Sequence, residues 1–250
     1  MTTTATAVGK FVWHEQVSSD PGQARDFYTE LFGWDTEIFK PGEIDYAMIS
    51  SGGRNHGGFG KAQEGAPPPH WLGHVQVDDV DETVEKAKQA GGTLAFGPMD
   101  MGEVGKFAII GDPQGAFVSV YQPAGEGDVA EGVFVWDELG TTDVEGAKRF
   151  YGEVFGWTIR DPGPDFGGYK LFQVGGTDIG GLMKLQDPSA KPGWVPYVGV
   201  EDVEETVAKA SQLGASTVVE AMDVPTVGRF AVIADPQGAV FGIIKGEPAS

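Results

Sequence analysis

The sequence of 250 residues contains no cysteine, few basic side chains and no long apolar run. Without cysteine there are no disulfides, no thiolate catalysis and no cysteine-bound zinc or iron–sulfur cluster, so a metal would need nitrogen or oxygen ligands. Only 17 basic residues face 37 acidic ones, and the resulting formal charge of −20 repels nucleic acids and anionic membranes. No apolar stretch approaches the ~20 residues of a membrane span, and the first residues carry no secretory pattern. We therefore expect a cytoplasmic protein whose partners are neither nucleic acid nor membrane.

An internal repeat organises the chain. A shift of 123 positions carries Phe11 onto Phe134 and the segment DPQGA at 112 onto an identical segment at 235, with no insertion or deletion. A chain of this length with 40% hydrophobic residues can bury two ordinary cores. We predict a first domain over 9–123, a second over 132–246, and a Gly- and Glu-containing linker over 124–131.

Each repeat contains the order strand, helix and three strands twice. In the first of these units a strand at 11–17 leads to Asp20, a preferred N-cap, and to Pro21 at the first helical position. The helix is expected to stop at Gly33, which favours a left-handed cap. A helix on one face of a curved antiparallel sheet leaves the other face as a cup. The sequence therefore predicts an α+β fold in which four βαβββ units form two tandem cupped antiparallel-sheet domains.

Several segments carry a resemblance to a known family: WHEQVSSDPGQARDFYTELFGW, HVQVDDVDETVEKAKQAGGT, FAIIGDPQGAFVSVYQP and their second-repeat counterparts. They resemble the vicinal oxygen chelate superfamily, which includes glyoxalase I, extradiol dioxygenases, fosfomycin-resistance transferases and bleomycin-resistance proteins. The resemblance covers 11–122 and 134–245 and implies the glyoxalase/bleomycin-resistance fold. It leaves the reaction open, because the superfamily spans unrelated chemistries and also proteins that only bind.

The resemblance also implies where a metal would lie. Enzymes of the superfamily hold one divalent ion, with a first-strand ligand seven residues before the helix-capping Asp and a Glu seven residues after the turn Asp. The corresponding residues here are Trp13, Leu72, Trp136, Val195, Ser119 and Gly242. None is a carboxylate or an imidazole, which a hard divalent ion needs. We predict no metal ligands and no cofactor, and keep a bound divalent metal as the alternative.

Polar side chains lie two residues beyond the first-strand positions. Because strand side chains alternate, these residues should face the same cups; they are Glu15, His74, Glu138 and Tyr197. Glu15 and His74 are the one carboxylate and imidazole expected in a single cup, so they are candidate catalytic residues, either as an acid/base pair or as two ligands of a metal. In the alternative interpretation, Glu15 and Glu138 only satisfy backbone or Trp donors.

The tryptophans at the cup floors leave two interpretations open. Trp13 and Trp136 can plug the cups or offer a stacking surface to a flat ligand. The predicted ligand-binding residues are Trp13, Glu15, His74, Ser119, Trp136, Glu138 and Tyr197. The leading hypothesis is a protein that binds a small aromatic or amphipathic molecule and lacks the family metal site.

Two alternatives remain at this point. One is a glyoxalase- or dioxygenase-type enzyme, that is a lyase, isomerase or oxygenase, with a displaced active site that uses Glu15 and His74. The other is a structural or interaction module with plugged cups. An oligomer is compatible with all three.

Overall fold

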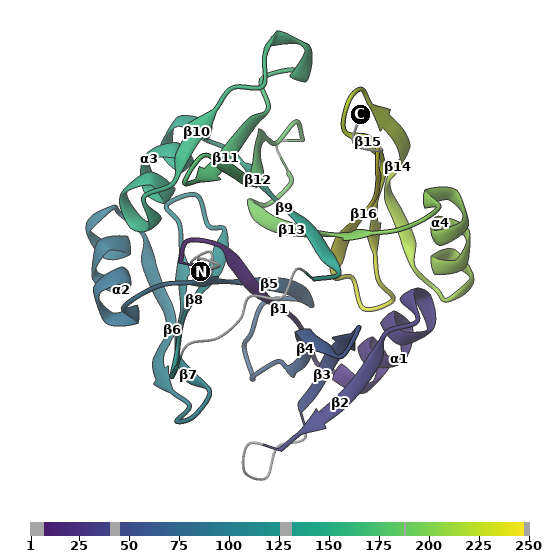
Figure 1. The fold of residues 1–250 in the computed structure, drawn as a ribbon, viewed down its shortest axis with the longest axis horizontal. Helices are drawn as coiled ribbons and strands as arrows, with labels where there is room; N and C mark the ends of the chain where they lie inside the picture. The colour runs from purple at the N-terminus through teal and green to yellow at the C-terminus, as the bar shows by residue number, and fades with distance from the viewer. Residues whose placement is uncertain (1–7, 41–45, 126–131, 188, 248–250) are drawn as a thin grey trace, which may run out of the picture. The chain divides into compact units, whose positions relative to one another are not determined.

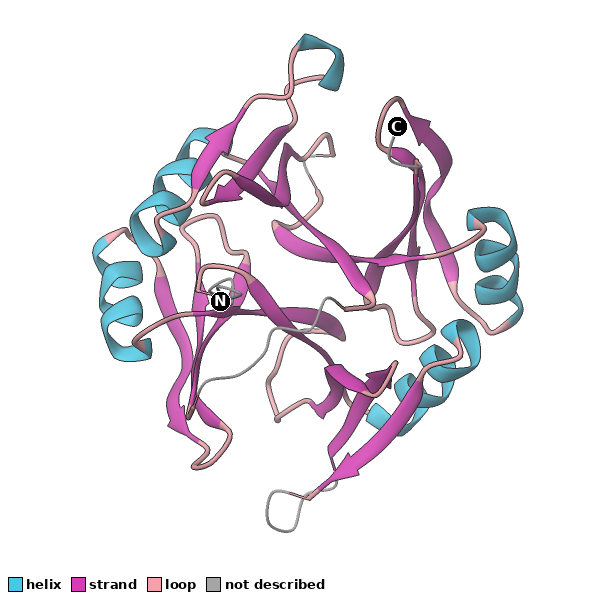
Figure 2. Ribbon diagram, in the orientation of Figure 1, coloured by secondary structure: helices cyan, strands magenta, loops and turns pink. Residues whose placement is uncertain are grey.

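The computed structural model describes residues 8–40, 46–125, 132–187 and 189–247. Within these residues the first repeat contains β1 (Phe11–Ser18), α1 (Pro21–Phe32), β2 (Asp35–Phe39), β3 (Tyr46–Ser51), β4 (Arg54–Lys61), β5 (His70–Gln76), α2 (Val80–Gln89), β6 (Thr93–Asp100), β7 (Gly105–Gly111) and β8 (Phe117–Pro123). The second repeat contains β9 (Phe134–Thr141), α3 (Val144–Phe155), β10 (Thr158–Arg160), a 3₁₀ turn (Pro164–Phe166), β11 (Lys170–Val174), β12 (Thr177–Lys184), β13 (Gly193–Gly199), α4 (Val203–Gln212), β14 (Ser216–Val224), β15 (Gly228–Ala234) and β16 (Val240–Gly246). The predicted α+β class and the four βαβββ units are confirmed (Figure 2).

The strands form two eight-stranded sheets. Their orders are β2-β3-β4-β1-β5-β8-β7-β6 and β10-β11-β12-β9-β13-β16-β15-β14. The sheets are mixed, which corrects the expectation of antiparallel sheets: β1 pairs parallel with β4, and β5 pairs parallel with β8. The reason is the helix after each first strand. A helical crossover returns the chain in the same direction, and two antiparallel hairpins then bring the fourth strand beside the first in parallel.

Local sequence accounts for the helix ends. The Asp20 carboxylate accepts a hydrogen bond from the Gln23 backbone N–H at 3.0 Å, and Asp143 does the same for Gly146. Such a bond satisfies one of the N–H groups that a helix start leaves without a partner. At the other end Gly33 takes φ +69°, a left-handed conformation that costs glycine little. The predicted caps of α1 are therefore confirmed.

Packing groups the chain into two compact units, each of which takes strands and helices from both repeats. Unit 1 comprises Met1–Trp13, Gly73–Val129 and Trp136–Trp194, and unit 2 comprises His14–Leu72, Ala130–Val135 and Val195–Ser250. In unit 1, α2 packs against α3, and in unit 2, α1 packs against α4 (Figure 1). The predicted domain boundaries follow the sequence repeat instead, and residues 126–131 of the predicted linker lie outside the described residues.

Each unit has its own hydrophobic core with a buried polar chain inside it. In unit 1, Trp194 Nε1 donates to the Tyr151 hydroxyl at 3.0 Å, and that hydroxyl donates to Asp112 Oδ2 at 3.2 Å. Asp112 belongs to the DPQG turn, and its Oδ1 accepts hydrogen bonds from three backbone N–H groups of that turn. Burial and the nearby Asp112 charge raise the pKa of Tyr151 well above its ordinary value. The phenol is therefore a neutral donor, and the chain joins segments from both repeats.

Unit 2 repeats this arrangement. Trp71 Nε1 donates to the Tyr28 hydroxyl at 2.8 Å, which donates to Asp235 Oδ2 at 3.1 Å. Gln16 adds a second donor to the same carboxylate oxygen. The identical DPQGA segments thus have the same role in both units: the turn aspartate accepts a hydrogen bond from a helix tyrosine, whose hydroxyl in turn accepts one from a strand tryptophan. Within the described residues, no helix is long and apolar enough to cross a membrane.

Candidate functional site

The two Trp-x-Glu segments on β1 and β9 have one half-buried face and one buried face. On β9, Trp136 and Glu138 are half-buried, whereas Asp137 between them is 5% exposed. On β1, Trp13 and Glu15 are half-buried, whereas His14 is buried and stacks on Phe134 at 4.1 Å between ring centroids. Alternation along the strand therefore puts each Trp and Glu on the face opposite the buried core.

Trp136 and Glu138 are joined by a tyrosine. Trp136 Nε1 donates to the Tyr169 hydroxyl at 3.1 Å, and that hydroxyl donates to Glu138 Oε2 at 2.8 Å. Burial, with the Glu138 charge as the second cause, raises the pKa of Tyr169 above its ordinary value. The phenol is therefore neutral, so that it accepts from the indole while it donates to the carboxylate. We call Trp136, Tyr169 and Glu138 the Trp–Tyr–Glu cluster.

A glycine makes room for this cluster. Gly181 on β12 pairs with Glu138 on β9, and a Cβ added at Gly181 would collide with the Tyr169 ring and lie 3.1 Å from Trp136 Nε1. The tyrosine thus rests directly on bare backbone. A similar arrangement occurs in unit 2, where Tyr46 covers Gly58 and the Glu15 carboxylate lies over Gly60.

Sequence reasoning missed both tyrosines. The 123-residue shift carries Tyr46 onto Tyr169 and Gly58 onto Gly181, so their repetition could have been read as a tyrosine resting on a glycine. Neither tyrosine is of a residue type, or lies at a sequence spacing, that by itself indicates a metal ligand or a catalytic group. The pairing becomes visible only when β11 and β12 lie side by side.

His74 and Ser119 meet on neighbouring strands of unit 1. They are partners in the parallel register of β5 and β8, and both are buried. Ser119 Oγ donates to the Ala108 carbonyl at 3.3 Å. The His74 ring centroid lies 6.4 Å from that of Phe107, which in turn stacks at 5.7 Å on Phe96. Phe96 is 42% exposed, so a row of aromatic rings leads from the imidazole to the surface.

The remaining predicted residues lie in unit 2. Tyr197 is 4% exposed and covers Gly242, its register partner on β16. Its ring centroid lies 6.2 Å from that of Phe230. Glu15 belongs to unit 2 and His74 to unit 1, and their pairing as acid and base stays a prediction. Of the predicted ligand-binding residues, Trp136, Glu138, His74 and Ser119 lie in unit 1.

Trp136, Ser119 and Gly242 stand at three of the positions where the sequence resemblance implies metal ligands. Trp136 donates its only polar hydrogen to Tyr169, Ser119 donates to a carbonyl, and Gly242 offers no side chain. Within the described residues, no group of three or more His, Asp or Glu is arranged to hold a metal. A hard divalent ion needs several such oxygen or imidazole ligands.

Comparison with known proteins identifies the family. The family model described as the Glyoxalase/Bleomycin resistance protein/Dioxygenase superfamily matches residues 10–120 and 134–243. The chain therefore belongs to this superfamily, as the sequence resemblance predicted.

Two relatives match over almost the whole chain. A Mycobacterium tuberculosis protein named "Putative glyoxylase CFP32" is 35% identical over 94% of each chain. A Streptomyces peucetius protein named "Anthracycline biosynthesis protein DnrV" is 31% identical over 98% of this chain and 97% of that one. Among solved structures, the Mn(II)-bound glyoxalase from Novosphingobium aromaticivorans aligns with a TM-score of 0.66 over 96% of this chain and 82% of that one. Its 14% identity shows the fold alone.

Proposed function

We propose that this protein binds a small, partly aromatic organic molecule, and that the Trp–Tyr–Glu cluster of unit 1 forms part of the binding surface. The observation that carries the proposal is the half-buried, hydrogen-bonded arrangement of Trp136, Tyr169 and Glu138. Such a cluster offers a flat apolar surface beside a carboxylate acceptor, and both are held in place before a ligand arrives.

The exposure of the six tryptophans supports a surface rather than a plug. Four of them, Trp34, Trp71, Trp157 and Trp194, are at most 7% exposed and belong to the two cores. Trp13 and Trp136 are instead half-buried. A side chain that only fills a cup would be sealed like the other four, so the partial exposure of these two favours contact with a ligand.

A second group of aromatic side chains, on the first sheet rather than on the sheet that carries the Trp–Tyr–Glu cluster, also indicates what kind of molecule would bind. Phe96 and Phe107 extend an aromatic surface from His74, and Phe96 and Met99 are large apolar side chains at 42% and 40% exposure. Apolar exposure of this kind is typical of binding sites. One relative is named for the biosynthesis of anthracyclines, which are flat polycyclic aromatic compounds, and a molecule of that shape matches these rings.

A calorimetric titration with an anthracycline tests the proposal. We expect saturable binding, and we expect Trp136→Ala to weaken it about tenfold, the loss of one favourable aromatic contact. Glu138→Gln should weaken the binding of a ligand that donates a hydrogen bond or carries positive charge at this position. Val135→Ala is the matched control, because Val135 is 52% exposed on the same strand and points to the opposite face.

The second candidate function is a glyoxalase-type or dioxygenase-type enzyme with a displaced active site, favoured by the relative named as a glyoxylase. Native mass spectrometry before and after chelation separates the two. A stoichiometric ion that chelation removes would support the enzyme and contradict a metal-free binder. A copurified organic molecule that survives chelation would support the binder, and bare protein that also fails to bind the anthracycline would favour plugged cups. The absence of a cofactor and the cytoplasmic location stay predictions.

A further inference from the structure

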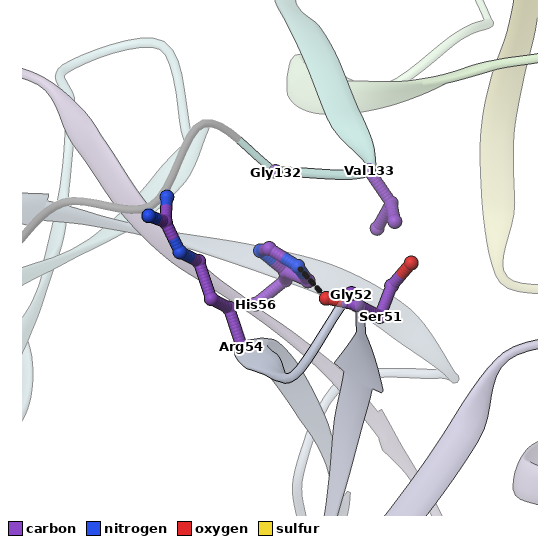
Figure 3. Close-up of a pocket in the computed structure, with 6 residues that line it drawn as sticks. All are labelled: Ser51, Gly52, Arg54, His56, Gly132 and Val133. Carbon is purple, nitrogen blue, oxygen red and sulfur yellow. Dashed lines mark hydrogen bonds between the residues drawn. The ribbon is translucent and has the colours of Figure 1, made fainter.

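A polar hollow of about 440 Å³ lies beside the β3–β4 hairpin of unit 2 and takes no part in the proposed function. It is lined by Ser51, Gly52, Arg54, His56, Gly132 and Val133 (Figure 3). Arg54 is exposed, whereas His56 is 7% exposed. The hollow thus combines a cation at its surface with an imidazole in its wall.

The orientation of His56 is set by the hairpin. Its Nε2 lies 3.1 Å from the Ser51 carbonyl oxygen, and because a carbonyl oxygen only accepts, Nε2 carries a proton. The other ring nitrogen, Nδ1, faces Gly132: a Cβ added at Gly132 would lie 2.9 Å from it. Any side chain at 132 would cover Nδ1, so this glycine leaves the second nitrogen open to the hollow.

The second repeat provides an internal comparison. Both repeats carry a Gly-Gly hairpin turn with positive φ, at Gly52-Gly53 and at Gly175-Gly176. The positions equivalent to Ser51, Arg54 and His56 are occupied by Val174, Thr177 and Ile179. Val174 and Ile179 pack against the hydrophobic core of unit 1. The hairpin therefore forms without Ser, Arg or His at these three positions, so the Ser, Arg and His of the first repeat are not required by its geometry.

We propose that this hollow binds a small oxyanion, a phosphate or carboxylate group, between the Arg54 guanidinium and the Nδ1 edge of His56. A guanidinium presents a planar fork of donors that matches both groups, and Nδ1 of His56 is a donor to an oxyanion in the form of the ring in which both nitrogens carry a proton. The chain as a whole carries a net charge of −20, so anions are repelled in general and a saturable anion site needs local positive charge.

The probes are inorganic phosphate and acetate, each titrated against chloride at equal ionic strength and followed by NMR of the four histidine rings. We expect saturable shifts confined to the His56 ring, with His14, His70 and His74 unchanged. A stronger response to phosphate assigns the site to phosphate groups, and an equal or stronger response to acetate assigns it to carboxylates. Shifts no larger than those with chloride would overturn the proposal.

Two variants use the residues of the second repeat, Arg54→Thr and His56→Ile. Each removes one of the proposed contacts, and Arg54→Thr should weaken anion binding by at least about tenfold, because it removes charged hydrogen bonds. Arg25→Thr is the control: it removes the same charge from a partly exposed arginine of α1 that pairs with Asp26. Equal loss in Arg54→Thr and Arg25→Thr would refute a specific site. Arg54→Thr keeps the test decisive even if His56→Ile does not fold.

Discussion

Removing the Tyr151 hydroxyl tests whether the buried polar chain stabilises unit 1. Tyr151→Phe keeps the ring, which is fully buried and packs at 5.3 Å against Trp194. It deletes only the oxygen that accepts from Trp194 Nε1 and donates to Asp112 Oδ2. No cavity of ring size is created, so any loss of stability comes from polar groups that lose their partners.

The size of the effect follows from the two groups left behind. A buried indole N–H without an acceptor costs about 1–3 kcal/mol, and a hydrogen bond to a charged group contributes about 1.5–3 kcal/mol. The oxygen itself also no longer needs to be desolvated, which offsets part of the loss. We therefore expect Tyr151→Phe to lower the free energy of unfolding by about 3 kcal/mol.

Urea unfolding measures this difference. The midpoint and the slope are reported together, because an unchanged slope shows that the substitution altered stability and not the surface exposed on unfolding. Tyr121→Phe is the matched control in the same unit, because its hydroxyl donates to the Val104 carbonyl in an exposed position, and its loss should cost less than about 1 kcal/mol. If the two variants lose equal stability, the chain of hydrogen bonds contributes nothing beyond a surface bond and the reasoning is refuted.

Two further predictions concern Asp112 of the DPQG turn and Gly181, the glycine on which Tyr169 rests. Burial raises the pKa of the Asp112 carboxyl group above 3.8 despite its hydrogen bonds. The contribution of Asp112 to the free energy of unfolding is therefore full below the pKa of the unfolded state. It is lost as pH rises through the pKa of the folded state. The stability of the wild type relative to Asp112→Asn should therefore fall over that window in urea titrations from acid to neutral pH; a rise would contradict the raised pKa. Gly181→Ala should displace Tyr169 and weaken anthracycline binding in calorimetry, whereas Gly193→Ala, where an added Cβ meets nothing within 4 Å, should leave binding unchanged.

Much of the fold could be predicted because its determinants are local. The Asp–Pro helix start, the glycine helix stop and the alternation of strand residues act over a few positions, and the structure confirms α1 at Pro21–Phe32. The exact 123-residue repeat then extended each local inference to the second half. The expectation of antiparallel sheets missed the parallel pairing of β1 with β4. That pairing depends on the path of a crossover helix, which no local sequence pattern indicates.

The candidate site was predicted in part. Strand alternation placed Trp136 and Glu138 on one face, and the structure adds that a tyrosine 31 residues away joins them. The hollow at His56 was not predicted, because Gly132 is separated from it by most of a repeat.

What the sequence by itself determined is the repeat, the order of elements and their caps, since these follow from short-range backbone preferences and periodicity. Only the tertiary structure decided that each compact unit takes elements from both repeats, that Asp112 of one repeat accepts from Tyr151 of the other, and which tryptophans stay half-buried. The physical reason is that such contacts depend on which surfaces bury apolar area together. That outcome is a property of the whole packed chain rather than of any segment.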